Sequence, residues 1–211
     1  MTDKKAQAPR LNPQLETVQL TAFEPDETYE GLFFEELTLK QTEVEMLFFK
    51  GCLFKNCQFE QVDFNNCDFQ DVQFEHCALL NCSLTNDPFQ RVAFNGCQLI
   101  GSDFAEAGLN DVTFDTCQAD YTGFNFARMR HVDFKDCSMQ EVSLGQVDWQ
   151  WLTMIGNRLN GMDMTGTNLK NLDISQNQFE KATFTLELLR GATISTEQTL
   201  VIMSALRINV R

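Results

Sequence analysis

The sequence predicts an all-β fold in which the chain winds into a four-sided coil of short parallel strands. An apolar residue, large at every position except Ala119, recurs at every fifth position from Phe34 to Ile194, at 33 positions without an insertion, and 15 of these residues are Phe. All eight cysteines lie two residues before one of these positions. A period of five would scatter the Phe side chains around a helix axis and would alternate them between the faces of a flat strand. A short extended step followed by a corner keeps them all inside, and four such steps close a coil.

A second period, of 20 residues, predicts how the coils stack. Phe recurs at positions 34, 54, 74, 94, 114 and 134, and a column of cysteines from Cys57 to Cys137 continues as Asn157 and Asn177. Like residues 20 apart indicate that each coil lies on the previous one at the strand spacing of about 4.8 Å. We therefore expect about eight coils, with the two asparagines forming a short side-chain ladder.

The two ends of the chain depart from the repeat. Residues 1–31 are expected to form an N-terminal tail and cap, with 1–14 loosely attached because they show no period. The β-helix is expected over 32–195, and a C-terminal helix and tail over 196–211. Ser195 and Gln198 have the spacing of a helix capping box.

The C-terminal segment is apolar nearly all round, which predicts a homodimer interface, since one coil edge could not cover it all. The alternative is that the helix caps only its own chain. The residues expected at the interface are Leu200, Val201, Met203, Leu206 and Ile208.

Asp87 and Pro88 form the clearest local fault in the repeat. Asp87 takes a position that should point inward, and Pro88 lacks a backbone donor. A bulge, a kink, a cis peptide bond or a tolerated irregular corner is expected there.

Composition narrows the class of protein. The formal net charge is −14 at pH 7, which argues against direct binding of nucleic acid and favours a basic partner. The sequence shows neither an 18-residue apolar run nor a secretory signal, and its cysteines are of the buried type. A cytoplasmic protein without a membrane span is expected.

The pattern contains no constellation that favours catalysis. The cysteines are five residues or one coil apart, whereas zinc ligands cluster as CxxC. His76 and His131 lie in different columns, and neither is part of a Ser- or Cys-based constellation in the sequence. A catalytic triad is therefore not expected. Without loop insertions to build a pocket, we expect neither an enzyme nor a metal or cofactor site.

Charge is the informative surface property. Residues 56–127 contain 11 acidic residues and one basic residue. One side of the coil carries acids without Lys or Arg, and the neighbouring side adds three more. This pattern is typical of either a solvated acidic surface or a surface that binds a basic partner. The candidate partner-binding residues are Glu43, Glu45, Asp63, Asp103, Glu106 and Asp163 on the first side, and Asp68, Asp71 and Asp111 on the second.

The repeat CLFKNCQFEQVDFNNCDFQDVQFEHC, at 52–77, resembles that of the pentapeptide-repeat proteins, and the resemblance covers about 32–196. It implies a right-handed quadrilateral β-helix. An uninterrupted acidic repeat followed by the tail STEQTLVIMSALRINV is similar to the Qnr and MfpA type, and to its members without projecting loops. That type consists of dimeric B-DNA mimics that bind DNA gyrase, often also topoisomerase IV, and are associated with reduced fluoroquinolone susceptibility.

Two functions follow as expectations. The first is a DNA mimic that binds gyrase, and in some members of this type topoisomerase IV, through its acidic sides. The alternative is an acidic β-helical scaffold or adaptor that binds another protein.

Overall fold

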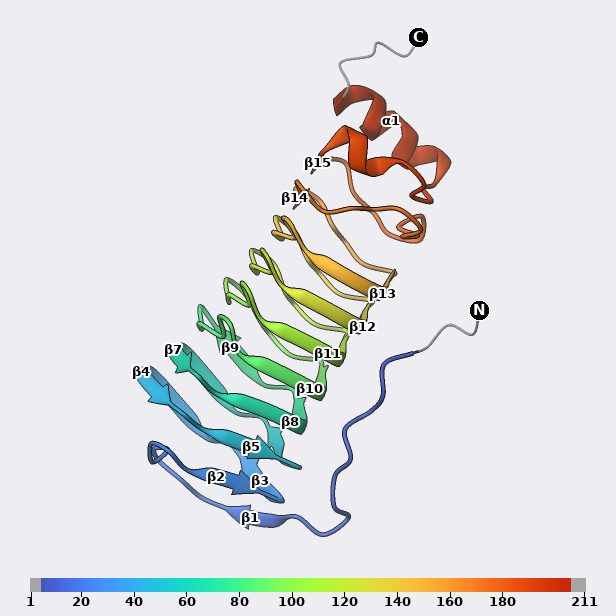
Figure 1. Ribbon diagram of the computed structural model, residues 1–211. Coiled ribbons are helices and arrows are strands. Elements are labelled where there is room, and N and C mark those ends of the chain that lie inside the picture. The colour runs from blue at the N-terminus through green and yellow to red at the C-terminus, as the bar shows by residue number, and fades with distance from the viewer. Residues whose placement is uncertain (1–4, 206–211) are drawn as a thin grey trace.

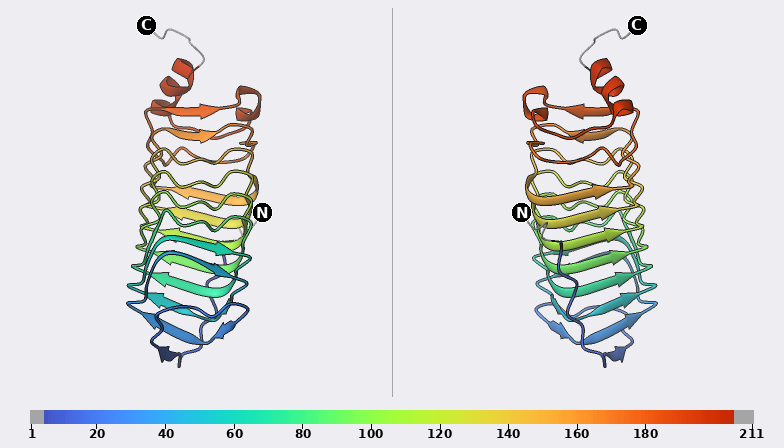
Figure 2. Two further views of the ribbon diagram at one scale, coloured as in Figure 1. Left: turned by 90° about the vertical axis from the view of Figure 1, so that its left-hand side faces the viewer. Right: turned by 90° about the vertical axis from the view of Figure 1, so that its right-hand side faces the viewer.

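The computed structural model describes residues 5–205 and forms a parallel β-solenoid of about eight coils, with one short helix at its C-terminal end (Figure 1). The coils stack into a straight rod, which Figure 2 shows from two opposite sides. The predicted fold class is therefore confirmed, and the pattern that set it appears directly in the pairing of the strands.

The secondary structure consists of short strands followed by two helical elements. These are β1 (Glu16–Val18), β2 (Thr28–Glu30), β3 (Leu32–Glu35), β4 (Thr38–Glu45), β5 (Phe48–Lys50), β6 (Leu53–Lys55), β7 (Gln58–Asn65), β8 (Asp68–Glu75), β9 (Ala78–Leu80), β10 (Pro88–Asn95), β11 (Gly108–Asp115), β12 (Arg128–Lys135), β13 (Asp148–Ile155), β14 (Met162–Met164), β15 (Ala182–Phe184), the 3-10 helix η1 (Leu186–Leu189) and α1 (Thr196–Ala205).

Strand pairing repeats at 20 residues along the rod. Phe94 pairs with Phe114, and Phe114 with Phe134, in parallel register. The first strand is the exception, because Glu16 pairs with Leu32 at an offset of 16. The chain before β2 therefore forms an abbreviated first layer rather than a full coil.

The strands β8, β10, β11, β12 and β13 each continue around a corner, so one ten-stranded sheet covers two adjacent sides of the rod. The corner residue adopts a left-handed backbone, as in Asp71, Arg91 and Asp111 with φ of 55°, 54° and 56°. The other two sides hold a three-stranded sheet of β4, β7 and β9, then single bridges between successive coils, and near the C-terminal end a two-stranded sheet of β14 and β15. The peptide bond before Pro88 is trans, and Pro88 pairs in register with Gly108, so this fault does not interrupt the coil.

The core is a stack of aromatic rings along the rod axis. The rings of Phe74, Phe94 and Phe114 lie 4.9 Å apart at interplanar angles of 3° and 2°. These three side chains are at most 2% exposed. Full burial of each contributes roughly 1.5–3 kcal/mol, which makes the stack the main source of stability.

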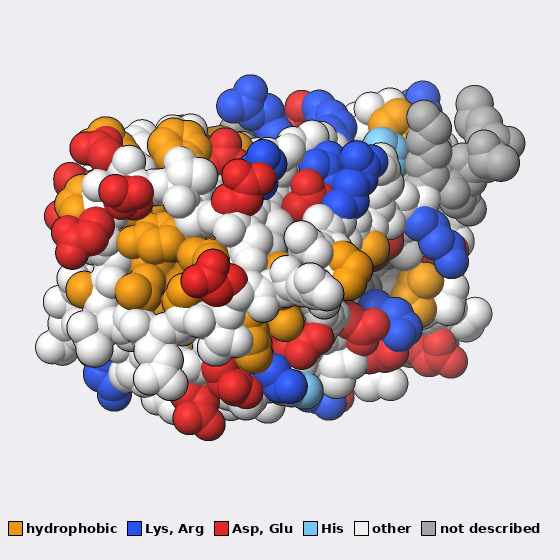
Figure 3. Space-filling view, turned by 90° about the horizontal axis from the view of Figure 1, so that it is seen from below, with side chains coloured by type: hydrophobic (Ala, Val, Ile, Leu, Met, Phe, Trp, Pro, Cys, Tyr) orange, Lys and Arg blue, Asp and Glu red, His pale blue; other side chains and the backbone are white. Residues whose placement is uncertain are grey.

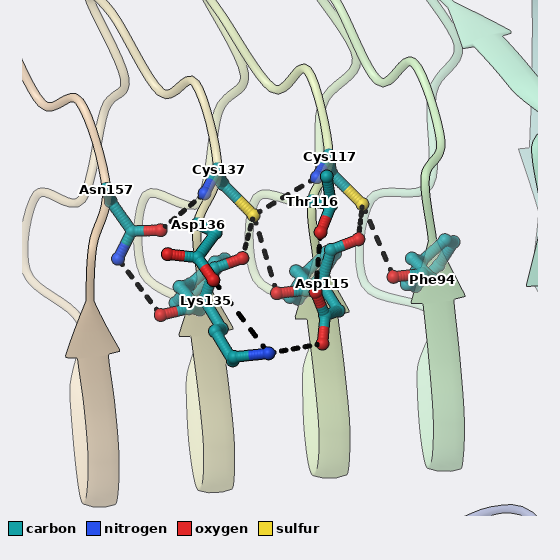
Figure 4. A network of polar contacts seen from close by, with 10 residues as sticks. Phe94, Asp115, Thr116, Cys117, Lys135, Asp136, Cys137 and Asn157 are labelled. Atoms are coloured by element: carbon teal, nitrogen blue, oxygen red, sulfur yellow. Dashed lines mark hydrogen bonds and ion pairs between the residues drawn. The ribbon is translucent and has the colours of Figure 1, made fainter.

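Small inward side chains form a second ladder beside the rings (Figure 4). The thiol of Cys137 donates to the carbonyl 23 residues earlier, at 3.4 Å. Asn157 follows the same rule with a stronger donor: Nδ2 reaches the carbonyl of Phe134 at 2.9 Å, and Oδ1 accepts from the Cys137 N–H at 2.9 Å. Asn157 Nδ2 also donates to Asn177 Oδ1 at 2.9 Å, which confirms the predicted asparagine ladder.

Helix α1 closes the C-terminal end of the rod. Ser195 and Gln198 form the predicted capping box: the Gln198 N–H donates to Ser195 Oγ at 3.3 Å and the Ser195 N–H to Gln198 Oε1 at 2.9 Å. Gln198 Nε2 donates to the carbonyls of Ile174 and Asn177, at 2.9 and 2.7 Å. Along the described part of the chain, no helix has the length and apolarity needed to cross a membrane.

The N-terminal segment differs from the sequence-based expectation. Residues 5–14, expected to be loosely attached, run back along the rod from β1 towards later coils (Figure 1). The Arg10 N–H donates to Asp71 Oδ1 at 3.0 Å, and the Gln7 N–H to Asp111 Oδ1 at 3.0 Å. The carboxylates of Asp71 and Asp111, which lie two coils apart, thus accept hydrogen bonds from a segment whose own sequence has no repeat.

Candidate functional site

The outward side chains on one side of the rod form a straight column. Glu43 pairs with Asp63, and bridges then connect Asp63, Ser83, Asp103, Gly123, Ser143 and Asp163 in turn. Each step is one strand spacing of about 4.8 Å, so the column extends over roughly 29 Å. We define the acidic face as this column's acids with two neighbours: Glu43, Glu45, Asp63, Asp103, Glu106 and Asp163.

The fold orients these carboxylates. Each column residue directly precedes an inward apolar residue, and strand alternation points it outward. Asp103 Oδ1 accepts from the Ala105 N–H at 2.9 Å. Asp163 Oδ1 accepts from the N–H and the hydroxyl of Thr165, at 2.8 and 2.6 Å. The carboxylates are therefore held at fixed intervals.

The negative charge of the acidic face is not neutralised within the described chain. None of the salt bridges among residues 5–205 involves any of its six members. Five of the six are exposed, and Asp163 is half-buried. A surface of this kind attracts a positively charged partner.

Charge varies along the rod as well as around it. Residues 56–127 carry 11 acids and one base, whereas residues 128–205 carry nine acids and seven bases. In Figure 3, acidic side chains surround an apolar patch at the end built by the first coils, and Lys and Arg gather towards the other end. The unbalanced negative charge is therefore concentrated in the first two thirds of the rod.

Two of the sequence-predicted site residues require a correction. Asp71 and Asp111 are 8% and 6% exposed, so they do not form part of an open acidic surface. Arg91 binds Asp71 through Nε and Nη2, at 2.6 and 2.7 Å. Burial opposes ionisation of Asp71, but the bonds from Arg91 and the Arg10 N–H outweigh it and hold its pKa below the usual range.

Asp111 is covered in the same way. Its Oδ2 accepts from Gln7 Nε2 at 3.3 Å, in addition to the bond from the Gln7 N–H, and His131 Nδ1 lies 3.7 Å from Oδ1. Asp68, the third predicted residue on this side, is half-buried, and burial raises its pKa. This side of the rod therefore binds the chain's own N-terminal segment.

Asp87, at a position expected from the repeat to point inward, is a buried carboxyl group. It is 1% exposed, and Oδ1 accepts from the Cys67 N–H at 2.9 Å. Its Oδ2 has no partner among the described residues. Burial raises the pKa of Asp87 to about 7; the Cys67 N–H opposes this rise, and the charges of Asp63 and Asp68 add to it. The group therefore titrates near neutral pH.

The predicted dimer residues lie partly within the described chain. On α1, Leu200 is 58% exposed, and Val201 and Met203 are half-buried. Ile202 is 8% exposed and, with Gln198, faces the chain's own last coils. Leu206 and Ile208 lie outside the described residues.

The repeat region matches two protein-family models. The model for pentapeptide repeats in eight copies matches residues 48–86, and the model for a pentapeptide repeat region matches 87–153. The two matches are contiguous and together span half of the chain. The chain belongs to the pentapeptide-repeat family. Comparison with curated protein sequences gives no significant match.

Solved structures of pentapeptide-repeat proteins resemble this one at low identity. Trypsin-treated QnrB1, a plasmid-mediated fluoroquinolone resistance protein, is 18% identical, with 92% of this chain and 95% of that chain covered and a TM-score of 0.41. HetL, involved in heterocyst differentiation regulation in the cyanobacterium Nostoc, is 13% identical, with 79% and 86% covered and a TM-score of 0.45. Similarity at this level says nothing of a partner or an activity.

Proposed function

We propose that this pentapeptide-repeat protein is a non-enzymatic mimic of B-DNA that binds DNA gyrase through its acidic face, with topoisomerase IV as a second candidate partner. The observation that carries the proposal is the column of outward carboxylates, held at multiples of the strand spacing and free of salt bridges in the described chain. Inhibition of the enzyme, or reduced fluoroquinolone susceptibility, would follow from competition with DNA.

The spacing of charge supports the comparison with DNA. B-DNA carries one negative charge per about 1.7 Å of its axis. A homodimer joined end to end through Leu200, Val201 and Met203 would carry 28 net negative charges over roughly 80 Å, or one per about 3 Å. That density is within a factor of about two of DNA on a rigid, narrow object, which suits a basic groove that accepts a duplex.

The free cysteines in the core of the rod also fit the cytoplasm, the compartment in which gyrase acts. All eight cysteines are buried and unpaired by disulfides. Free thiols persist in the reducing cytoplasm, which is where we expect this protein to act.

The test is gyrase supercoiling of relaxed plasmid with the protein titrated in at two salt concentrations. Inhibition at micromolar concentration that weakens as salt rises is expected, because ionic contacts are screened. Absence of inhibition by an intact dimer would reject gyrase and favour the scaffold alternative.

Charge reversal identifies the binding surface. The triple variant Asp63→Lys, Asp103→Lys and Glu106→Lys is expected to abolish inhibition while the protein stays folded. A matched triple variant reverses Glu35, Glu36 and Asp136, which are exposed on or beside the opposite side. Either triple raises the net charge from −14 to −8, since each reversal adds two units. Equal loss in both variants would mean that net charge, not the acidic face, controls binding.

A further inference from the structure

Two exposed aromatic side chains flank the acidic face on a single coil. Tyr121 is 66% exposed and Phe126 is 52% exposed. They occupy the corners before and after the side that contains Gly123 and Asn125. Gly123 pairs with Asp103 of the acidic column and so lies between the two rings in the chain.

Both residues have a backbone conformation that does not suit them. Tyr121 and Phe126 each have φ of 61°, in the left-handed region. Bulky side chains rarely adopt this region, whereas Gly and Asn enter it readily. In neighbouring coils the corresponding corners are occupied by Asn81, Gly101, Glu141, Asn86, Glu106 and Gln146.

The fold therefore gains little from these two rings. They add backbone strain, and more than half of each side chain remains in water. Left-handed corners recur along this rod, for example at Met46 and His131, so the exposure of the two rings, rather than their backbone conformation, sets them apart. Exposed aromatic residues are also enriched among the side chains that dominate binding at protein interfaces.

The surroundings of the rings specify the chemistry of a partner. Phe126 and Glu106 line a shallow hollow of about 360 Å³ together with Asn86 and Arg128. Gly123 leaves the carboxylate of Asp103 open, because a Cβ at this position would come within 2.6 Å of Asp103 Oδ1. An aromatic face beside a carboxylate is a site for a planar cation, which stacks on the ring and is paired by the acid.

We propose that Tyr121 and Phe126 are aromatic anchors that stack against arginine guanidinium groups of the basic protein surface bound by the acidic face. The inference rests on the proposed function, since a DNA-binding surface supplies arginines. It adds selectivity: carboxylates alone attract any cation, whereas the rings favour Arg over Lys, whose ammonium group is compact and strongly hydrated.

The first experiment does not require gyrase. Binding of nona-arginine and nona-lysine peptides to the full-length protein is measured by calorimetry at fixed salt. We expect a preference of about tenfold for arginine in the wild-type protein. The double variant Tyr121→Asn and Phe126→Asn should lose this preference, and the control Ile155→Asn, at an exposed position on the opposite side, should keep it.

Stability provides an internal control. Asn tolerates a left-handed corner, so the double variant should unfold at the same temperature as wild type or higher. An arginine preference that is absent from wild type, or that survives in the double variant, would overturn the inference.

The second experiment measures affinity for purified gyrase. We expect the double variant to bind about tenfold more weakly than wild type. If wild type binds and the double variant binds equally well, the aromatic anchors are rejected and the proposed function stands. If wild type does not bind gyrase, the proposed function fails, and the peptide measurement decides the inference by itself.

Discussion

The early coils, 34–147, and the late coils, 148–194, obey the same five-residue rule but differ in what fills it. Every apolar centre from Phe34 to Leu144 is buried, and stacked Phe rings continue as far as Phe134. Beyond this, Trp149, Phe184 and Ile194 are only half-buried. The last strand of eight residues is β13, and β14 and β15 after it have three residues each.

The difference shows that the repeat fixes the path of the chain, whereas the inward side chains fix how completely each coil buries its centres. The early coils combine aromatic stacking with thiol bonds. The late coils have mostly Leu, Met and Ile at their centres and the amide bonds of Asn157 and Asn177 in place of thiol bonds, and they meet α1. The acidic face lies mainly on the early coils, where the centres are buried and successive coils pair in register.

Removing one ring from the aromatic stack should have the largest effect on stability. Phe94 is fully buried between two parallel rings, so Phe94→Ala is expected to cost about 3–5 kcal/mol. Phe184→Ala, at a half-buried late position, should cost about 1–2 kcal/mol. Urea unfolding followed by circular dichroism measures both. Equal losses would contradict the difference between the two regions.

The buried carboxyl group of Asp87 should make stability depend on pH. Its pKa in the folded protein, about 7, lies above the value of about 3.9 for an unfolded chain. The folded state therefore holds a proton that the unfolded state has lost. The free energy of unfolding should fall by roughly 2–4 kcal/mol as pH rises from 4 to above 7.

Asp87→Asn is expected to remove this fall, because the amide supplies a neutral group. Asn157 shows that an amide fits such an inward position, accepting an N–H and donating to a carbonyl. The control is Asp103→Asn, at an exposed carboxylate. Denaturant unfolding at several pH values compares the three proteins. A wild-type slope that persists in Asp87→Asn would show that another group titrates.

The inward ladder should be stronger in the late coils than in the early ones. Asn157→Ala leaves a buried N–H and a buried carbonyl without partners, which should cost about 2–4 kcal/mol. Cys137→Ala removes weaker thiol bonds and should cost about 1–2 kcal/mol. Chemical denaturation of both variants tests this order, and a reversed order would mean that sulfur packing outweighs amide hydrogen bonding.

Deleting residues 1–14 should have the smallest effect. The deletion removes the N–H donors of Gln7 and Arg10, but water can replace them, and the pair of Asp71 with Arg91 remains. A loss of about 1 kcal/mol is expected. Deletion of residues 1–6 is the matched control, because it keeps both donors. If the longer deletion lowered the free energy of unfolding by more than about 3 kcal/mol, the segment would be an essential part of the folded structure, contrary to this prediction.

The sequence was sufficient for features whose partners lie at a fixed separation. The coil register, the ladder of Asn157 and Asn177 and the capping box of Ser195 and Gln198 all repeat or are local, so spacing alone predicted them. The burial of Asp71 and Asp111 was not predictable in this way. It depends on contacts 61 and 104 residues away with a segment that has no period.

One signal for the pairing of Asp71 with Arg91 was present in the sequence. Asp71, Arg91 and Asp111 alternate in charge at 20-residue spacing. Such alternation indicates side chains that pair with each other rather than with a partner. The raised pKa of Asp87 required the structure, because it depends on the depth of burial and on the orientation of Oδ2.

The two bonds from Gln198 to the carbonyls of Ile174 and Asn177 have a consequence for assembly. In earlier coils, inward side chains such as Cys97, Cys137 and Asn157 donate hydrogen bonds to carbonyl groups of the preceding coil. The last coil has no following coil to supply such donors. The side-chain amide of Gln198 supplies these donors instead and so ends the stack of coils. A chain without this side chain would leave both carbonyls unpaired at the end of the rod, and an unpaired edge of this kind favours the addition of another chain.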